Sequence, residues 1–151
     1  MIVNLQRKIK INSAAFMPFL VAVRAAVEEV HCCNFSVALV SDRRMKELNQ
    51  VFRGKDSTTD VLSFPHEPDE FEIAHASSFT STDDPNHRFL GDIVISVEQA
   101  ERQAKENKLT LDLEIKQLIL HGVLHLCGFD HETDIGEMNA RELELREKLG
   151  I

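Results

Sequence analysis

The chain has 151 residues, enough for one domain with a single hydrophobic core and no stabilising disulfides. Its formal charge of −8 argues against a uniformly basic surface, and no apolar run approaches the ~20 residues that a membrane span needs. The charge is uneven, because residues 1–65 carry nine Lys and Arg against six Asp and Glu, whereas residues 66–151 carry eight against nineteen. A basic face built from the first half is therefore still compatible with a polyanionic partner.

The spacing of apolar residues predicts four short strands and five helices in mixed order. Alternation of apolar and polar side chains, or a following breaker, predicts strands at residues 2–5, 35–40, 61–64 and 90–97. Helical spacing predicts helices at residues 13–29, 42–51, 97–108, 110–126 and 133–149. The expected N-terminal capping residues are Ser13, Ser41 or Asp42, Thr110 and Thr133.

Residues 66–88 form a polar stretch that is rich in Ser, Thr and Asp, follows Pro65 and contains Pro68 and Pro85. It has no periodicity, which predicts a mobile, variable loop. The mixture of strands and helices predicts one α+β domain over residues 1–151, with a small mixed four-stranded sheet packed against about five helices.

The strongest chemical signal is residues 121–131, which read His-Gly-Val-Leu-His-Leu-Cys-Gly-Phe-Asp-His. His121 and His125 are four residues apart and share one face of a helix. Gly128 tolerates the left-handed conformation that ends a helix, and the turned chain brings His131 back toward the other two. Two histidines at this spacing, without a third, more often lie on the surface or in the core than bind a metal. Three converging imidazoles without a fourth protein ligand are instead typical of a catalytic zinc site.

The three cysteines are an odd number, and Cys32 and Cys33 are adjacent, which favours free thiols in a reducing compartment. We expect Cys32 and Cys33 to pack at the end of a helix. Cys127 lies two residues beyond His125 on another side of the helix, so we expect a small buried apolar residue rather than a fourth ligand. The N-terminus lacks the charged start and apolar core of a signal peptide, so we expect a cytoplasmic protein.

A zinc ion held by three neutral imidazoles lowers the pKa of bound water from ~15.7 toward ~7, or acts as a Lewis acid on a phosphoryl oxygen. Zinc peptidases of the H-E-x-x-H type carry a general base directly after the first histidine, where this chain has Gly122. Arg53 offers a planar, permanently charged fork that matches phosphate oxygens; the alternative is a surface arginine in a loop.

Three aspartates are candidate partners of the ligands. Asp130 either accepts a hydrogen bond from an imidazole and fixes its tautomer, or is a turn residue at the helix end. Asp60 and Asp92 either support the ligands in the same way or accept hydrogen bonds from local backbone donors.

The segment of residues 121–131 resembles the H-G-x-L-H-L-x-G-(Y/F)-D-H motif of the YbeY family of rRNA maturation factors. Two further stretches are similar to family segments in order and spacing. Residues 52–65 resemble R-x-x-x-x-x-T-D-V-L-S-F-P, and residues 90–93 resemble L-G-D-I. The resemblance extends over nearly the whole chain.

This resemblance implies an α+β metallohydrolase that binds one Zn²⁺ per chain and cleaves single-stranded RNA. It implies that His121, His125 and His131 hold the zinc, that Arg53 lines the substrate cleft, and that Arg53 and His121 are catalytic. The implied roles are maturation of the 3′ end of 16S rRNA and ribosome quality control. The implied partners are single-stranded rRNA and the ribosome or its small subunit, with neither membrane nor DNA.

Several alternatives stay open from the residues alone. The nucleophile is either a water molecule or the RNA's own 2′-hydroxyl. A small zinc-dependent peptidase or other hydrolase is one rival function. A non-catalytic ribosome assembly factor, in which zinc ties the histidine helix to the turn at His131, is the other.

Overall fold

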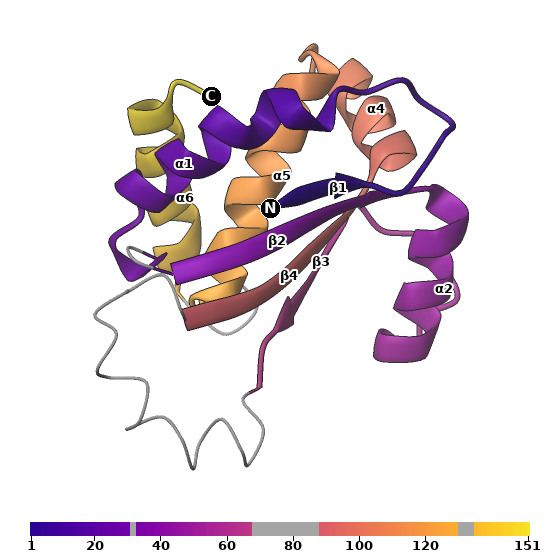
Figure 1. Cartoon of the computed structure of the whole chain (residues 1–151), viewed down its shortest axis with the longest axis horizontal. Helices are drawn as coiled ribbons and strands as arrows, with labels where there is room; N and C mark the ends of the chain where they lie inside the picture. Colours follow the sequence, from indigo (N-terminus) through magenta and orange to yellow (C-terminus); the bar gives the residue numbers. More distant parts are fainter. Residues whose placement is uncertain (31–32, 68–87, 130–134) are drawn as a thin grey trace.

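The computed structural model describes residues 1–30, 33–67, 88–129 and 135–151 (Figure 1). Its four-stranded sheet has the order β1-β2-β4-β3. The strands β1 (Ile2–Asn4), β2 (Cys33–Val40) and β4 (Arg88–Ser96) are parallel to one another, and β3 (Val61–Pro65) is antiparallel to β4. The predicted α+β fold with a mixed four-stranded sheet is confirmed.

Five α-helices surround this sheet in the described part of the chain. They are α1 (Met17–Ala26), α2 (Asp42–Arg53), α4 (Val97–Glu106), α5 (Leu111–Leu126) and α6 (Glu137–Leu149). Two short 3₁₀ turns, η1 (Ser13–Phe16) and η2 (Glu28–Val30), flank α1. In Figure 1, α2 stands apart from the other four helices. None of the described helices has the length and apolar character needed to cross a membrane.

The alternation in β2 directs its side chains to two different cores. Phe35, Val37 and Leu39 are buried in the main core, which they share with apolar residues of α1, α4, α5 and α6. On the opposite face, Val40 joins a small cluster with Met45 of α2, and its other two buried members come from β3 and β4. The sheet therefore has one thickly covered face and one face covered by a single helix.

Two of the predicted caps are confirmed. The Ser41 side chain accepts a hydrogen bond from the backbone N–H of Arg44 at the start of α2. Thr110 accepts one from the backbone N–H of Leu113 at the start of α5. Each cap satisfies a backbone donor that the first helical turn leaves without a partner.

The predicted cap at Ser13 is wrong, because Ser13 begins η1 and the α-helix starts at Met17. Pro18 explains the difference, since a helix starting at Ser13 would place a residue without a backbone N–H in its interior, whereas α1 holds it in the first turn. The helix also ends at Ala26, and residues up to Val30 form the separate turn η2.

The last predicted helix also begins later than expected, at Glu137 after Gly136, whose φ of 104° is left-handed. Thr133, its expected cap, lies outside the described residues, as does most of the predicted loop. Cys33 begins β2 and is buried, so the expected packing at a helix end is wrong for this residue, whereas Cys32 lies outside the described residues.

Candidate functional site

The helix α5 presents His121 and His125 away from its sheet-facing side. Both side chains are half-buried, and their Nε2 atoms lie 3.1 Å apart. After them, Gly128 adopts a φ of 94°, so the helix ends in the predicted left-handed turn. The structure therefore brings two of the three predicted ligands to one point.

The remaining predicted members of this cluster, His131 and Asp130, lie outside the described residues. Within the described ranges, no group of three or more His, Cys, Asp or Glu residues could hold a metal ion. Cys127 is the C-cap residue after α5, and burial raises the pKa of its thiol to about 11, so it is neutral at cellular pH. A neutral thiol is a poor metal ligand.

Glu142 of α6 contacts His121. Its Oε2 atom lies 3.3 Å from Nδ1 of His121, and its Oε1 accepts a hydrogen bond from Nη2 of Arg146 at 3.0 Å. Glu142 is only 7% exposed. Burial by itself raises the pKa of this carboxyl, but His121 and Arg146 outweigh that effect and lower it. Glu142 is therefore a carboxylate that holds the His121 ring by its Nδ1 atom, which leaves Nε2 to face His125.

Sequence reasoning did not identify Glu142. The available signal was a charged residue on the apolar face of an amphipathic helix, since Met138, Glu142 and Leu145 are the buried residues of α6. A buried carboxylate at such a position requires a partner, and His121 and Arg146 are its partners.

Gly122 occupies the place of the peptidase base, and the structure gives a steric reason for the glycine. The residue is buried against β4, and a Cβ atom there would lie 2.7 Å from Cγ2 of Ile93. A longer side chain would point into the packed sheet, away from the histidine side. This position of α5 has no room for a glutamate.

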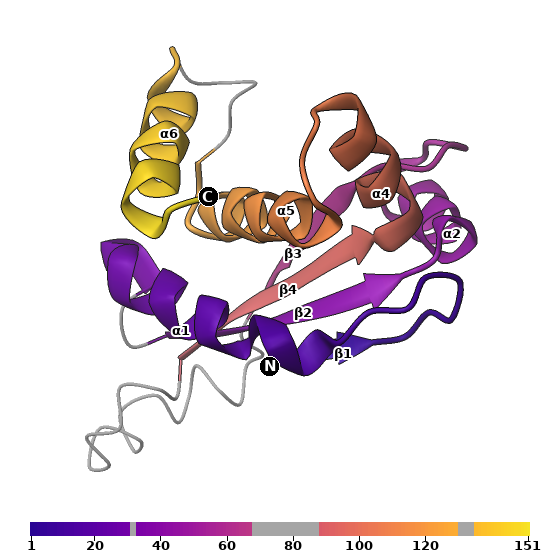
Figure 2. The same ribbon diagram turned by 90° about the horizontal axis from the view of Figure 1, so that it is seen from above.

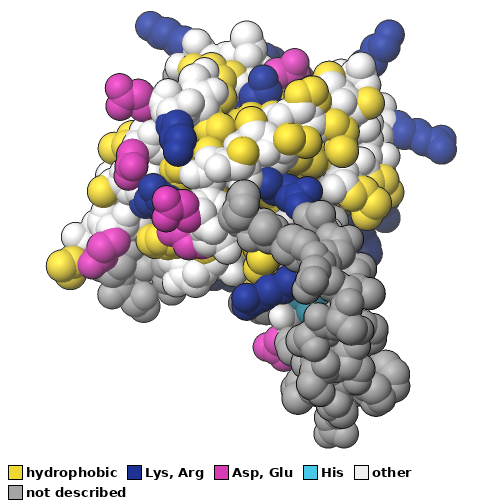
Figure 3. All heavy atoms as spheres, turned by 60° about the vertical axis from the view of Figure 1, so that its left-hand side comes forward, with side chains coloured by type: hydrophobic (Ala, Val, Ile, Leu, Met, Phe, Trp, Pro, Cys, Tyr) yellow, Lys and Arg dark blue, Asp and Glu magenta, His cyan; other side chains and the backbone are white. Residues whose placement is uncertain are grey.

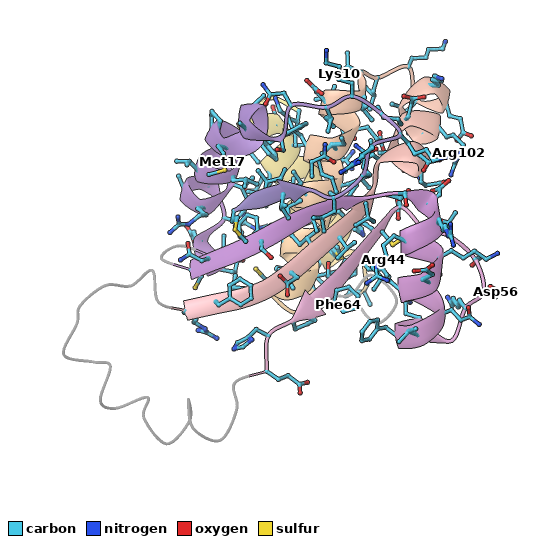
Figure 4. The ribbon with its side chains drawn as sticks, turned by 45° about the vertical axis from the view of Figure 1, so that its right-hand side comes forward. Lys10, Met17, Arg44, Asp56, Phe64 and Arg102 are labelled. Carbon is cyan, nitrogen blue, oxygen red and sulfur yellow. The ribbon has the colours of Figure 1, made fainter. Side chains whose placement is uncertain are left out.

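Arg53 is the last residue of α2 and is exposed. The helix α2 packs on the sheet face opposite to α5, so the sheet lies between Arg53 and the histidines. The neighbouring Phe52 is 62% exposed and meets the ring of Phe64 edge to face, with ring centroids 5.0 Å apart. Figure 4 shows Phe64 beside the end of α2.

The edge strand β3 contacts both the histidine helix α5 and the end of α2 near Arg53. The Ser63 hydroxyl donates a hydrogen bond of 3.2 Å to the carbonyl oxygen of Gly122, next to His121. The adjacent residue Phe64 points to the other face and meets Phe52, next to Arg53. Consecutive side chains of a strand point to opposite faces. Arg53 and the histidines therefore flank the same level of β3, one on each side of the sheet.

Asp60 precedes β3, and its Oδ1 accepts a hydrogen bond of 2.7 Å from the backbone N–H of the next residue, Val61. Its Oδ2 accepts a hydrogen bond from Nε2 of Gln103 at 3.3 Å. Asp60 also lines a pocket of about 500 Å³ whose wall includes His121. The structure thus places Asp60 beside the candidate site.

Asp92 lies elsewhere. It is exposed on the face of β4 that is turned away from α5, where it accepts a hydrogen bond from the Ser36 hydroxyl. The structure does not bring Asp92 together with the two described histidines.

A family model described as endoribonuclease YbeY matches residues 1–150 of the chain, which include the fold and the histidine pair described above. The chain belongs to the endoribonuclease YbeY family. The family name describes enzymes that cleave RNA internally, which are hydrolases.

Individual relatives agree with the family match. The endoribonuclease YbeY of Nautilia profundicola is 44% identical over 118 residues, which is 78% of this chain and 73% of the relative. That of Caldanaerobacter subterraneus is 36% identical over 151 residues, which is 96% of this chain and 94% of the relative. The solution structure of TM1509 from Thermotoga maritima matches with a TM-score of 0.59 and 29% identity, over 99% of this chain and 89% of that one.

Proposed function

We propose that this member of the family is a zinc-dependent endoribonuclease that cleaves single-stranded RNA. We further propose that it acts in the cytoplasm on the 3′ end of 16S rRNA and in ribosome quality control. The observation that carries the proposal is the pair of imidazoles on α5, with Nε2 atoms 3.1 Å apart and with Nδ1 of His121 beside the buried Glu142.

The spacing of the two nitrogens fits a shared metal ion. Two nitrogen ligands at the usual zinc distances of ~2.0–2.1 Å are about 3.3 Å apart at a tetrahedral centre. The observed 3.1 Å is close to that value. His131 is the proposed third ligand, because the left-handed Gly128 turns the chain three residues before it. The fourth position is left to the substrate or to water.

Bound zinc would supply a Lewis acid and an activated water molecule to the reaction. The chain's own residues have separate tasks. Glu142 orients the His121 ring through its Nδ1 atom, so that Nε2 would be available to hold the ion. Arg53 binds the oxygens of the phosphodiester through its guanidinium fork. Gly122 leaves this site without the glutamate base of the H-E-x-x-H peptidases, which favours phosphodiester over peptide chemistry.

An RNA strand that crosses the edge of β3 would meet both groups. In the described part of the chain β3 pairs only with β4, so no strand covers its outer edge. Arg53 stands on one side of this edge, and the histidines stand on the other. The exposed ring of Phe52 offers a stacking surface to an unpaired base. These features favour a single strand over a duplex, whose paired bases are stacked inside.

The face of the molecule seen in Figure 3 carries no broad basic surface. On the face seen in Figure 3, the described Lys and Arg side chains are scattered among hydrophobic and acidic ones. The net charge of −8 agrees with this arrangement. We therefore expect the selectivity of RNA binding to come from the neighbourhood of Arg53 and Phe52.

The central test measures bound zinc and RNA cleavage together. We expect about one zinc ion per chain in the wild type, and loss of both zinc and cleavage in His125→Ala or after treatment with a chelator. His66→Ala is the control for removal of an imidazole, because the His66 ring packs edge to face against Phe89 and is not one of the proposed ligands, so the zinc content should stay unchanged. Wild-type protein that holds no zinc, or that cleaves RNA equally well with chelator, would contradict the proposal.

The same variant separates catalysis from a purely structural role of zinc. If His125→Ala keeps its circular dichroism spectrum and its cosedimentation with small ribosomal subunits but loses cleavage, the assembly-factor alternative fails. If it unfolds instead, zinc is structural and the enzymatic proposal loses its support. Cells that carry the variant should also accumulate 16S rRNA with an unprocessed 3′ end.

A substrate with a single 2′-deoxynucleotide at the scissile position distinguishes the two nucleophiles. Continued cleavage of this substrate excludes the 2′-hydroxyl, and complete loss of cleavage identifies it as the attacking group.

A further inference from the structure

A polar pocket lies between α4 and α6 on top of α5, and Figure 2 shows these two helices on either side of α5. Its volume of about 500 Å³ is within the range of small-ligand sites. Gln103 and Asn107 line it at the end of α4, Gln117 and Glu114 line it on α5, and His121 forms part of the same wall. The pocket is therefore continuous with the candidate site.

We propose that this pocket binds a nucleobase of the RNA substrate next to the cleaved position, and that Glu114 accepts a hydrogen bond from the exocyclic amino group of that base. The inference rests on the proposed function for the identity of the substrate, since a polar pocket alone would suit other uncharged ligands.

The charge of the lining argues against an anionic ligand, and its geometry argues against a metal ion. Asp60, Glu114 and Glu142 outnumber the single cation Arg146, whose Nη2 already binds Glu142. A phosphate group would face this net negative wall. The described residues give the pocket no metal site of its own, because no three of their His, Cys, Asp or Glu side chains come close enough together to hold a metal ion. An uncharged ligand with hydrogen-bonding groups remains.

Two buried atoms in this lining lack a protein partner. Oε2 of Glu114 and Nε of Arg146 are buried without a hydrogen bond to any described residue. Glu114 itself is only 5% exposed. Buried polar atoms without partners are costly, so a ligand that supplies a donor to one and an acceptor to the other would stabilise the site.

A nucleobase has this combination of groups along one edge. Its amino group donates to a carboxylate, as cytosine does to Glu and Asp in nucleic-acid complexes. The amides of Gln103, Asn107 and Gln117 can donate and accept in turn. Because His121 belongs to the same wall, the bound base would belong to a nucleotide adjacent to the phosphate at the histidine pair.

The direct test is titration of the ¹⁵N-labelled full chain with adenosine, cytidine, guanosine and uridine in separate NMR experiments. We expect saturable shifts of the side-chain amide signals of Gln103, Asn107 and Gln117 with the three nucleosides that carry an amino group. Uridine, which carries none, should bind about tenfold more weakly, since hydrogen bonds to charged groups contribute roughly that factor or more.

Glu114→Gln should reduce the affinity for the amino-bearing nucleosides about tenfold. Glu106→Gln is the matched control, because Glu106 is exposed at the end of α4 and should leave the affinity unchanged. If Glu114→Gln fails to fold, Gln117→Ala provides a second variant of the same wall. No shift of the three amides, equal binding of uridine, or unchanged affinity in both variants would overturn the proposal.

Nucleosides contain no phosphodiester bond, so this binding does not depend on cleavage. Binding without any cleavage of RNA would support the pocket and count against the proposed function. In an active enzyme, sequencing the products of a randomised single-stranded RNA should reveal depletion of uridine at one position beside the cut. Glu114→Gln should remove that depletion.

Discussion

The two faces of the sheet differ in how many buried side chains pack against them and in the roles that we propose for their residues. The face toward α5 holds the main core, including side chains from α1, α4, α5 and α6. Among the described residues, the face toward α2 buries four apolar side chains in its cluster. The thick face fixes the histidine pair and Glu142, whereas the thin face leaves Phe52 and Arg53 exposed. The buried support of the histidine pair and the exposed side chains of Phe52 and Arg53 thus lie on opposite sides of one edge strand.

The largest expected difference is in core substitutions. Ile119 in the main core and Met45 in the small cluster are both completely buried. We expect Ile119→Ala to lower the free energy of unfolding by about 2–5 kcal/mol. Met45→Ala should fall at the low end of this range, because its partly buried neighbours can close the cavity. Denaturant titration of both variants measures the difference, and equal losses would mean that both faces are packed alike.

Gly122→Ala tests how closely α5 rests on β4. The new methyl group would lie 2.7 Å from Cγ2 of Ile93, so we expect a loss of about 1–3 kcal/mol in the free energy of unfolding. Ile93→Ala should relieve the contact, so the double variant should be more stable than the sum of the single effects predicts. Strict additivity in this double-mutant cycle would show that the helix and strand are not in contact there.

Glu142→Gln tests the support of the ligands from α6. Loss of the carboxylate beside His121 should weaken zinc binding about 10–100-fold, measured by competition with a chromophoric chelator. Glu144→Gln is the matched control, because Glu144 is exposed on the same helix and pairs only with Arg141 among the described residues. Equal zinc affinity in both variants would assign Glu142 to packing alone.

Phe52→Ala tests the thin face. Its ring is mostly exposed and contacts Phe64 edge to face, so we expect a loss of only about 0.5–1.5 kcal/mol in the free energy of unfolding. The KM for single-stranded RNA should rise while zinc content stays constant. Val51→Ala removes a side chain of similar exposure one residue away and should leave KM unchanged. An unchanged KM in Phe52→Ala would remove this ring from the RNA site.

The smallest expected effect concerns Asp42, which joins α2 to β4 and α4. Its carboxylate accepts hydrogen bonds from Ser96 at 2.6 Å, Arg102 at 2.6 Å and Thr58 at 3.2 Å. Burial raises the pKa of Asp42, but these partners outweigh it and lower the pKa below 3.8. The stabilisation is therefore complete above the unfolded value of 3.8 and is lost as the pH falls through the folded value.

Because Arg102 is half exposed, we expect this stabilisation to be about 1 kcal/mol or less. The difference in unfolding free energy between wild type and Asp42→Asn should be largest above pH ~4 and shrink below it. A difference that is constant with pH would show that the charge of Asp42 contributes nothing.

Local patterns predicted the elements whose causes are local. The caps at Ser41 and Thr110, the alternation in β2 and the turn at Gly128 each depend on a few neighbouring residues. The start of α1 was misplaced because the restriction imposed by Pro18 outweighed a good capping residue upstream. This error also had a local cause, and it was visible in the sequence.

The sequence by itself determined that two histidines share a helix face and that a turn at Gly128 follows them, because helical periodicity and helix-ending residues depend on a few neighbouring positions. The sequence placed Arg53 in a loop after a helix ending at residue 51, whereas α2 continues through Arg53. Only the tertiary structure decided that Glu142, 21 residues away, would hold His121. It alone decided that Arg53 and the histidines would lie on opposite sides of β3. The physical reason is that burial and strand order arise from contacts between distant segments, which no local spacing records.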